Sequence, residues 1–92
     1  MIFSFRDKDT RSLYETGHSR RFRSIERIAL RKLDMLAAAT MVETLRIPPG
    51  NRLESLSGDR SGQWSICVND QWRICFKWSG ANAEEVEIVD YH

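Results

Sequence analysis

The sequence contains no long apolar run, and this absence excludes a membrane-spanning helix. Such a helix needs roughly 20 consecutive apolar residues, and no segment of the 92-residue chain approaches that length. A secretion signal is not expected either, because charges follow directly after the short apolar stretch Met1–Phe5. We therefore expect a cytoplasmic protein with no membrane partner.

Groups that bind metals or phosphate-bearing cofactors are also scarce. The two histidines, His18 and His92, are far apart in sequence, and the two cysteines lack the close spacing of metal ligands. The segment Gly58–Gly62 fits neither a P-loop nor a dinucleotide-binding pattern. We predict no metal and no cofactor, and we interpret His18 as an ordinary loop residue.

Charge is unevenly distributed along what we expect to be one small domain, residues 1–92. Residues 1–60 hold 12 of the 14 basic and 8 of the 13 acidic residues, whereas residues 61–92 hold 2 basic and 5 acidic ones. The densest basic cluster comprises Arg20, Arg21, Arg23, Arg27, Arg31 and Lys32. Such a cluster can attract nucleic acid or an acidic protein, and it can equally be a solvated helix face.

The segment from Gly62 to Trp78 predicts a β-hairpin. Large apolar residues occupy alternate positions on both sides of a turn, namely Trp64, Ile66 and Val68, then Trp72, Ile74, Phe76 and Trp78. This period of two is typical of strands with one buried face. Arg73 projects from the less apolar face, which we expect to be the working surface, and no apolar packing should depend on its guanidinium.

The register of the hairpin follows from keeping both apolar sets on one face. Pairing Val68 with Trp72 leaves residues 69–71 as a three-residue loop. A two-residue loop would instead pair Ile66 with Arg73 and bury a charge. The three-residue loop is therefore predicted.

This register also decides the state of the cysteines. Cys67 lies opposite Arg73 and diagonal to Cys75, at about 7–8 Å. A disulfide needs Cα atoms about 4.4–6.8 Å apart. Both cysteines are therefore predicted to be free thiols, as is usual in a reducing cytoplasm.

Two helices are predicted before the hairpin. The first is capped by Asp7 or Asp9 and ends at Gly17. The second is capped by Ser24 and ends near Ala39. Its apolar residues form one stripe with a period of 3.6, made of Ile25, Ile28, Ala29, Leu33 and Leu36.

The remaining segments complete a small α+β fold. Ile2–Phe5 predicts a short first strand, Val42–Leu45 a further helical turn, residues 52–62 an irregular connection, and Val86–Val89 a last strand. The order β-α-α-β-β-β places two helices on one face of a mostly antiparallel four-stranded sheet.

The last three residues combine an acceptor, a phenol and an imidazole, in Asp90, Tyr91 and His92. Histidine is the commonest general acid or base near neutral pH. If Val86 and Ile88 face the core, strict alternation also turns Asp90 inward, unless the strand ends or bulges first.

Three stretches of the chain, Leu53–Ile66, Asn69–Phe76 and Asp90–His92, resemble the HigB-type toxins of the RelE/ParE superfamily, which belong to bacterial type II toxin–antitoxin systems. The opening Met1–Phe5 is similar to theirs as well, so the resemblance covers nearly the whole chain. It implies a RelE-like fold and a metal-independent endoribonuclease that cuts ribosome-bound mRNA and inhibits translation.

The resemblance also implies partners. These are the ribosome and its mRNA, together with a HigA-like antitoxin that carries a helix-turn-helix domain and neutralises the toxin. Operator DNA would be contacted only through the antitoxin.

The resemblance also implies roles for residues at matching positions. Arg73 would stabilise the phosphate, and His92, with the two residues before it, would transfer protons and position RNA. Glu54 stands where some relatives have histidine, and Ser57 where some have lysine, so Glu54 is a candidate base. The basic residues expected to contact RNA or the ribosome are Arg52, Arg60, Lys77, Arg20, Arg21 and Arg23.

Two other functions stay open. A toxin of the same fold could act only by binding a protein target such as gyrase, and a non-catalytic module could bind RNA through the basic cluster. Arg73 and the ending Asp90–His92 favour the nuclease. The cluster contains one aromatic residue, Phe22, which is too few for a platform that stacks successive bases.

Overall fold

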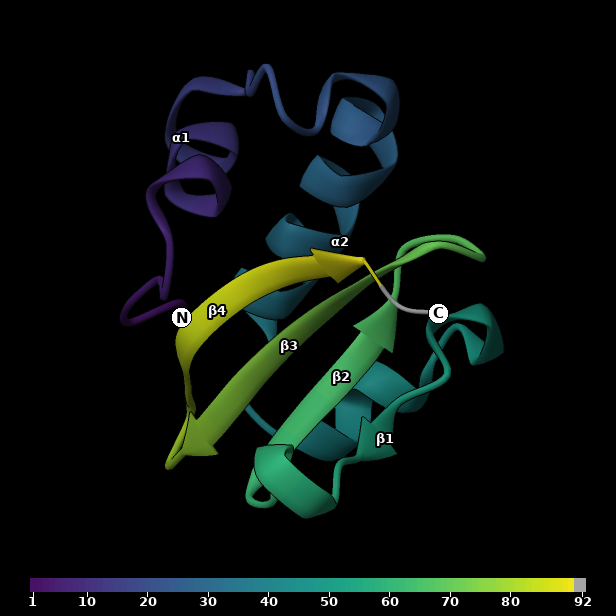
Figure 1. Ribbon diagram of the computed structural model, residues 1–92. Coiled ribbons are helices and arrows are strands. Elements are labelled where there is room, and N and C mark those ends of the chain that lie inside the picture. Colours follow the sequence, from purple (N-terminus) through teal and green to yellow (C-terminus); the bar gives the residue numbers. More distant parts are fainter. Residues whose placement is uncertain (91–92) are drawn as a thin grey trace.

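The chain folds as two helices on one face of an antiparallel sheet (Figure 1). In this computed structural model, which describes residues 1–90, the helices are α1 (Lys8–Thr16) and α2 (Glu26–Ala38). The strands are β1 (Glu54–Ser55), β2 (Gln63–Cys67), β3 (Trp72–Ser79) and β4 (Asn82–Asp90), and they lie side by side in that order. The predicted α+β class is confirmed. Within residues 1–90, no helix combines the length and the apolar character that a membrane crossing requires.

The prediction of a first strand at Ile2–Phe5 is wrong. Ile2 and Phe5 form only isolated parallel bridges, to Ala83 and Val86 of β4. Glu85 lies between these two positions in a left-handed conformation, with φ 51°, and it interrupts a continuous ladder along that edge. The fourth strand is instead the two-residue β1, which lies within the stretch expected to be irregular.

The hairpin formed by β2 and β3 has the predicted register. Ile66 lies opposite Ile74, and Cys67 lies opposite Arg73. The three-residue loop is confirmed, because the backbone N–H of Val68 donates to the carbonyl of Trp72 at 2.9 Å. Both cysteines are free thiols, as predicted.

A side chain replaces the glycine that such a loop usually needs. Asn69 Oδ1 accepts hydrogen bonds from the backbone N–H groups of Gln71 and Trp72, both at 2.8 Å. This Asx turn satisfies two donors of the loop locally and holds its shape.

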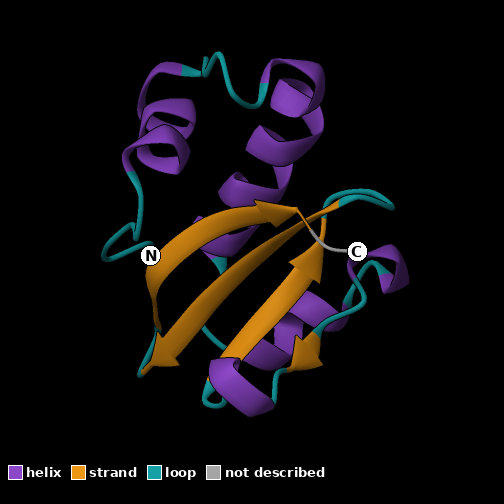
Figure 2. Ribbon diagram, viewed as in Figure 1, coloured by secondary structure: helices purple, strands orange, loops and turns teal. Residues whose placement is uncertain are grey.

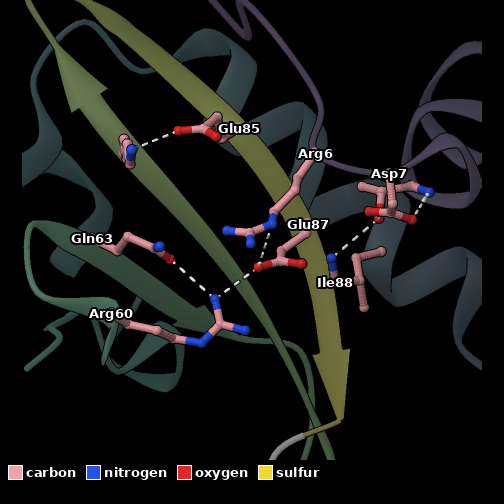
Figure 3. Close-up of polar contacts among 9 residues, drawn as sticks. Arg6, Asp7, Arg60, Gln63, Glu85, Glu87 and Ile88 are labelled. Carbon is pink, nitrogen blue, oxygen red and sulfur yellow. Dashed lines mark hydrogen bonds and ion pairs between the residues drawn. The ribbon is translucent and has the colours of Figure 1, made fainter. Parts of the chain in front are cut away.

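Helix α1 has the predicted ends. Asp7 is the N-cap, and its carboxylate accepts from the Thr10 backbone N–H at 2.9 Å and from the Thr10 hydroxyl at 2.7 Å. Gly17 ends the helix in the left-handed conformation, with φ 81°. The buried Thr10 hydroxyl also accepts from the Ile88 N–H at 3.1 Å, so the start of α1 is tied to β4 (Figure 3).

Helix α2 starts differently from the prediction. Ser24 does not cap it, because a short 3₁₀ turn, Arg23–Ile25, precedes the helix and its N-cap position is Ile25. Instead, the Glu26 carboxylate accepts from the Ser19 backbone N–H at 3.0 Å. Of the predicted apolar stripe, only Ile28 is exposed, at 39%, because it lies at the margin of the stripe on the helical wheel.

The core lies between the two helices and the sheet. Its fully buried side chains include Leu13, Phe22, Leu33, Leu36, Leu45, Ile66, Ile74 and Phe76. The three tryptophans pack against this core but are only partly buried. The hairpin therefore contributes to the core mainly through its smaller apolar residues and Phe76.

Three short 3₁₀ turns connect α2 to β2 around and beside β1 (Figure 2). They are Val42–Arg46, Pro49–Asn51 and Gly58–Arg60. Asn51 anchors the second turn, because it is fully buried, donates to the Leu45 carbonyl at 3.1 Å and accepts from Lys32 Nζ at 2.6 Å. This anchor fixes the chain directly before Arg52, where the candidate site begins.

Candidate functional site

The sheet face that points away from the helices is polar, and its centre is nevertheless buried. Ser65 on β2 is fully buried, and Arg73 and Cys75 on β3 are 6% and 2% exposed. The segment Arg52–Arg60 runs past this face, with β1 pairing to β2 and Arg60 reaching Glu87 of β4. The face is therefore partly enclosed by the chain itself.

Arg73 lies at the centre of this face. Its Nε donates to Ser65 Oγ and its Nη2 donates to the Arg52 carbonyl, both at 3.0 Å. Glu54 Oε2 lies 3.9 Å from Nη2, and the Glu54 side chain is 50% exposed. The guanidinium, which was expected to support no apolar packing, makes polar contacts that link β2 to the segment before β1.

The backbone at Arg52 contributes to this arrangement. Arg52 adopts the left-handed conformation, with φ 47°. This conformation is uncommon for residues other than glycine, and here it accompanies a turn whose carbonyl faces Arg73. The turn at Arg52 therefore helps to position Arg73.

A pocket of about 250 Å³ opens beside Arg73. It is lined by Glu54, Ser55, Leu56, Ser57, Arg60 and Cys75. Burial raises the pKa of the Cys75 thiol, so that it is neutral near pH 7. The polar groups at the wall of the pocket are thus one carboxylate, one guanidinium and two serine hydroxyls.

Arg60 lies at the wall of this pocket, between two acceptors from different strands (Figure 3). Its Nη1 donates to Glu87 Oε1 at 2.7 Å and to Gln63 Oε1 at 3.1 Å. The hydrogen bond to Glu87 raises the pKa of Arg60, which therefore stays charged. Sequence reasoning missed Glu87, because 27 residues separate it from Arg60.

Asp90 lies at the end of β4, opposite Trp72, and it is exposed. Gln71 Nε2 donates to Asp90 Oδ2 at 3.1 Å. The irregularity of the ladder falls earlier, between Cys75 and Lys77, so strand alternation places Asp90 on the side of Ile88 and not on that of Arg73. Tyr91 and His92 lie outside the described residues.

The basic residues singled out from sequence fall into separate places. Arg52 and Arg60 border the site, whereas Lys77 lies towards the other end of β3 and pairs with Glu85 at 2.7 Å. Arg20, Arg21 and Arg23 are exposed in the connection between α1 and α2, at the far end of the molecule from β1 (Figure 1). Only Arg52 and Arg60 are thus brought together with Arg73 and Glu54.

Among residues 1–90, no group of three or more His, Cys, Asp or Glu side chains is arranged to hold a metal ion. The polar groups that line the pocket or lie beside it include guanidinium groups, serine hydroxyls and the Glu54 carboxylate. Such a set can bind a phosphate and accept a proton.

Known proteins are similar to this chain over most of its length. Residues 3–92 match the family model of the RelE-like toxin of type II toxin–antitoxin system HigB. Toxin HigB-1 of Vibrio cholerae is 45% identical over 80 residues, which cover 85% of this chain and 84% of the relative. Endoribonuclease HigB of Proteus vulgaris is 35% identical, and the alignment covers 100% of both chains.

Solved structures share the fold at much lower identity. The YoeB–YefM complex from Staphylococcus aureus aligns with a TM-score of 0.59 and 12% identity, covering 100% of this chain and 98% of that chain. A YoeB/ParE toxin from Agrobacterium tumefaciens aligns with a TM-score of 0.58 and 18% identity over 100% of both chains. These likenesses establish the fold, and the closer relatives establish the family.

Proposed function

This chain belongs to the HigB family of RelE-like toxins of type II toxin–antitoxin systems, and from that membership we propose that it is an endoribonuclease that cuts mRNA on the ribosome. The observation that carries the proposal is the pairing of Arg73 with Glu54 beside a pocket that also contains Arg60. This arrangement supplies guanidinium groups that can bind a phosphate and a carboxylate that can accept a proton.

The proposed reaction uses a nucleophile that RNA itself provides. Glu54 removes the proton of a ribose 2′-hydroxyl, whose oxygen attacks the adjacent phosphorus and displaces the 5′-oxygen of the next nucleotide. The products are a 2′,3′-cyclic phosphate and a free 5′-hydroxyl, which takes a proton from a general acid. His92 is the candidate acid. Asp90 and Tyr91 are candidates for handling protons with it and for positioning the RNA.

Arg73 stabilises the negative charge that develops on the phosphate oxygens in this scheme. Its ion pair with Glu54 is loose, at 3.9 Å, and the Glu54 side chain is half exposed. An RNA phosphate that enters the pocket can therefore displace Glu54 from Arg73 at little cost. Once it is displaced, Glu54 is no longer paired with Arg73 and can accept a proton as the base.

The ribosome is expected to provide much of the rate enhancement. Holding the 2′-oxygen in line with the scissile bond converts a rare geometry into the ground state, an effect worth up to about 7–11 kcal/mol. A small enzyme with one carboxylate and a few cations then needs to supply only proton transfer and charge stabilisation. No metal ion is required by this scheme.

We place the protein in the cytoplasm, as a single domain of residues 1–92, with a HigA-like helix-turn-helix antitoxin as its inhibitor. The toxin would reach operator DNA only through that antitoxin. Arg52, Lys77 and the exposed arginines Arg20, Arg21 and Arg23 are candidates for contact with ribosomal RNA or with the antitoxin. Lys77 and the three exposed arginines lie away from the pocket, which fits docking better than chemistry, whereas Arg52 borders the site.

Primer extension on mRNA from cells expressing the protein tests the proposal directly. We expect new 5′ ends within translated regions, and purified protein should cut mRNA on translating ribosomes far faster than naked RNA. EDTA should leave any activity on naked RNA unchanged. Growth inhibition without new 5′ ends would instead indicate a toxin that binds a protein target.

His92→Ala is the companion test of the candidate acid. Loss of a positioned proton-transfer group lowers a rate by about 10²–10⁴-fold. We expect a loss of this size in single-turnover cleavage, with antitoxin binding unchanged. Cleavage at the wild-type rate would remove His92 from the mechanism.

A further inference from the structure

Glu87 carries a partly buried carboxylate that the proposed reaction does not use. Its side chain is 16% exposed, and one of its oxygens lies 2.7 Å from Arg60 Nη1 and 4.0 Å from Arg6 Nε (Figure 3). It therefore holds together β4, the 3₁₀ turn Gly58–Arg60 and the segment before α1. A carboxylate with two cations around it is a strong anchor for the nearer one.

The anchor leaves most of the Arg60 guanidinium available. Nη1 takes both acceptors, Glu87 and Gln63, and no partner of Nη2 or Nε is found within residues 1–90. The Arg60 side chain is 39% exposed and lines the pocket, whereas Glu87 does not line it. One edge of the guanidinium is thus fixed to the sheet, and the rest can contact a ligand.

Arg60 and Arg73 differ in what they can offer to RNA. The Arg73 side chain is 7% exposed, and its Nε and Nη2 already donate to Ser65 and to the Arg52 carbonyl. Arg60 is much more accessible, and among residues 1–90 its partners are bound by Nη1 alone. A guanidinium edge with two donors matches two oxygens of one phosphate.

From this geometry we infer that Arg60 contacts a phosphate of the RNA in the pocket, and that Glu87 is the positioning residue that orients Arg60 for this contact. The inference rests on the proposed nuclease function, specifies the contact that Arg60 makes in it, and adds a role for Glu87. An arginine side chain that is already ordered loses less conformational freedom when it binds. Glu87 thus lowers the cost of the contact without touching the RNA.

Electrostatics alone predicts the opposite consequence for removal of Glu87. Deleting a carboxylate next to Arg60 makes the site more positive, so RNA affinity should rise and KM should fall. If Glu87 positions Arg60, its removal should lower kcat even though the site has gained positive charge. The electrostatic reading thus predicts a lower KM with kcat not reduced, whereas the positioning role predicts a lower kcat, and the two can be separated.

The experiment compares variants in single-turnover cleavage of mRNA on translating ribosomes. Arg60→Ala is expected to lower kcat by about 10²-fold, because the contact with the phosphate is lost. Glu87→Ala is expected to lower kcat by about 10-fold, because Arg60 is no longer held in position for that contact. Glu87→Gln should keep kcat within about threefold, since its amide oxygen still accepts from Nη1. In the Arg60→Ala background, Glu87→Ala should have no further effect on kcat.

Glu85→Ala is the matched control. Glu85 lies on the same strand, its carboxylate pairs with Lys77 at the same 2.7 Å, and its removal changes the net charge equally. It does not line the pocket, so kcat should stay within about twofold of wild type. Equal losses of kcat in Glu85→Ala and Glu87→Ala would overturn the inference, as would an unchanged or higher kcat in Glu87→Ala.

A second measurement needs no ribosome and no cleavage. In ¹⁵N NMR of the whole chain, titration with inorganic phosphate should shift the Arg60 Nε–H signal in the wild type, and less so in Glu87→Ala at equal phosphate. No shift of that signal in the wild type would refute the phosphate contact. Failure of the wild type to cleave mRNA would instead refute the proposed function, and the titration would still decide the binding role. Melting temperatures confirm that each variant is folded.

Discussion

The centres of the two sheet faces are similarly shielded from water, yet they are built from opposite kinds of side chain. On the face that the helices cover, Ile66 and Ile74 are fully buried and need no polar partner. On the other face, Ser65 and Arg73 are almost as buried, and they hydrogen-bond to each other. Within residues 1–90, no buried side-chain nitrogen or oxygen lacks a hydrogen-bond partner.

This difference teaches that burial alone does not separate core from site in so small a protein. An apolar core residue contributes through the area it removes from water. A buried guanidinium is costly to place, and it is stabilised only by the acceptors around it. Substitutions on the two faces should therefore have different effects: those on the polar face should lower activity, and those on the apolar face should lower stability.

The largest effect is expected for Arg73→Ala. Loss of the central cation should lower mRNA cleavage by about 10³-fold. It should also cost about 1–3 kcal/mol of unfolding free energy, because the Ser65 hydroxyl and the Arg52 carbonyl lose their donor. Cleavage per folded molecule and urea denaturation measure the two losses.

Arg73→Lys refines this prediction. A lysine restores the charge but not the two directed donors, so rescue of cleavage should be partial. If Arg73→Ala retains full toxicity at matched expression, the assignment of this face as the site is wrong.

Ile74→Ala is the neighbouring change on the helix-covered face. Ile74 is fully buried, and its truncation should cost about 2–5 kcal/mol of unfolding free energy by leaving a cavity. Cleavage per folded molecule should be unchanged well below the melting temperature. Ile74→Val, expected to cost about 0.5–1.5 kcal/mol, gives the same comparison in a more stable protein. A specific loss of activity in either variant would show that the two faces are not independent.

Glu54→Gln sharpens the contrast at the edge of the polar face. The Glu54 side chain is half exposed, so stability should change little. If Glu54 is the base, cleavage should fall by about 10²-fold or more. Glu54→Asp, which keeps a carboxylate, should retain weakened cleavage. A Glu54→Gln protein with wild-type kinetics would leave the base unassigned.

The smallest effect is expected at Glu85, which is exposed and pairs with Lys77. The hydrogen bond from Lys77 lowers the pKa of Glu85 in the folded state. The stability that this pair contributes is therefore present above the ordinary glutamate pKa, and it is lost as pH falls through the lowered value. Glu85→Gln should be slightly less stable than wild type at pH 7 and indistinguishable from it in strong acid. Urea titrations at both pH values test this, and a difference that grows in acid would contradict it.

Local patterns were sufficient where the deciding contacts lie close together in the chain. The hairpin register could be predicted because two apolar sets with a period of two can share a face in only one way around a short loop. The ends of α1 could be predicted because a capping carboxylate and a left-handed glycine act within one turn of the helix.

Local patterns failed where a distant partner competes with the nearby one. Ser24 is a good cap by type, but Glu26 binds the backbone of Ser19 and a 3₁₀ turn precedes the helix. Ile2–Phe5 has the composition of a strand, but the left-handed Glu85 interrupts the edge with which it would pair.

For the candidate site, the sequence by itself determined which residue types are present and that Arg73 and Ser65 share one face of the sheet. The second fact follows from the period of two and the hairpin register, because paired residues of neighbouring strands point to the same side. Only the tertiary structure decided that the Arg52 carbonyl meets Arg73 across 21 residues and that Glu87 meets Arg60 across 27. Such pairs depend on how the segment Arg52–Arg60 packs against the sheet, and no local periodicity encodes that packing.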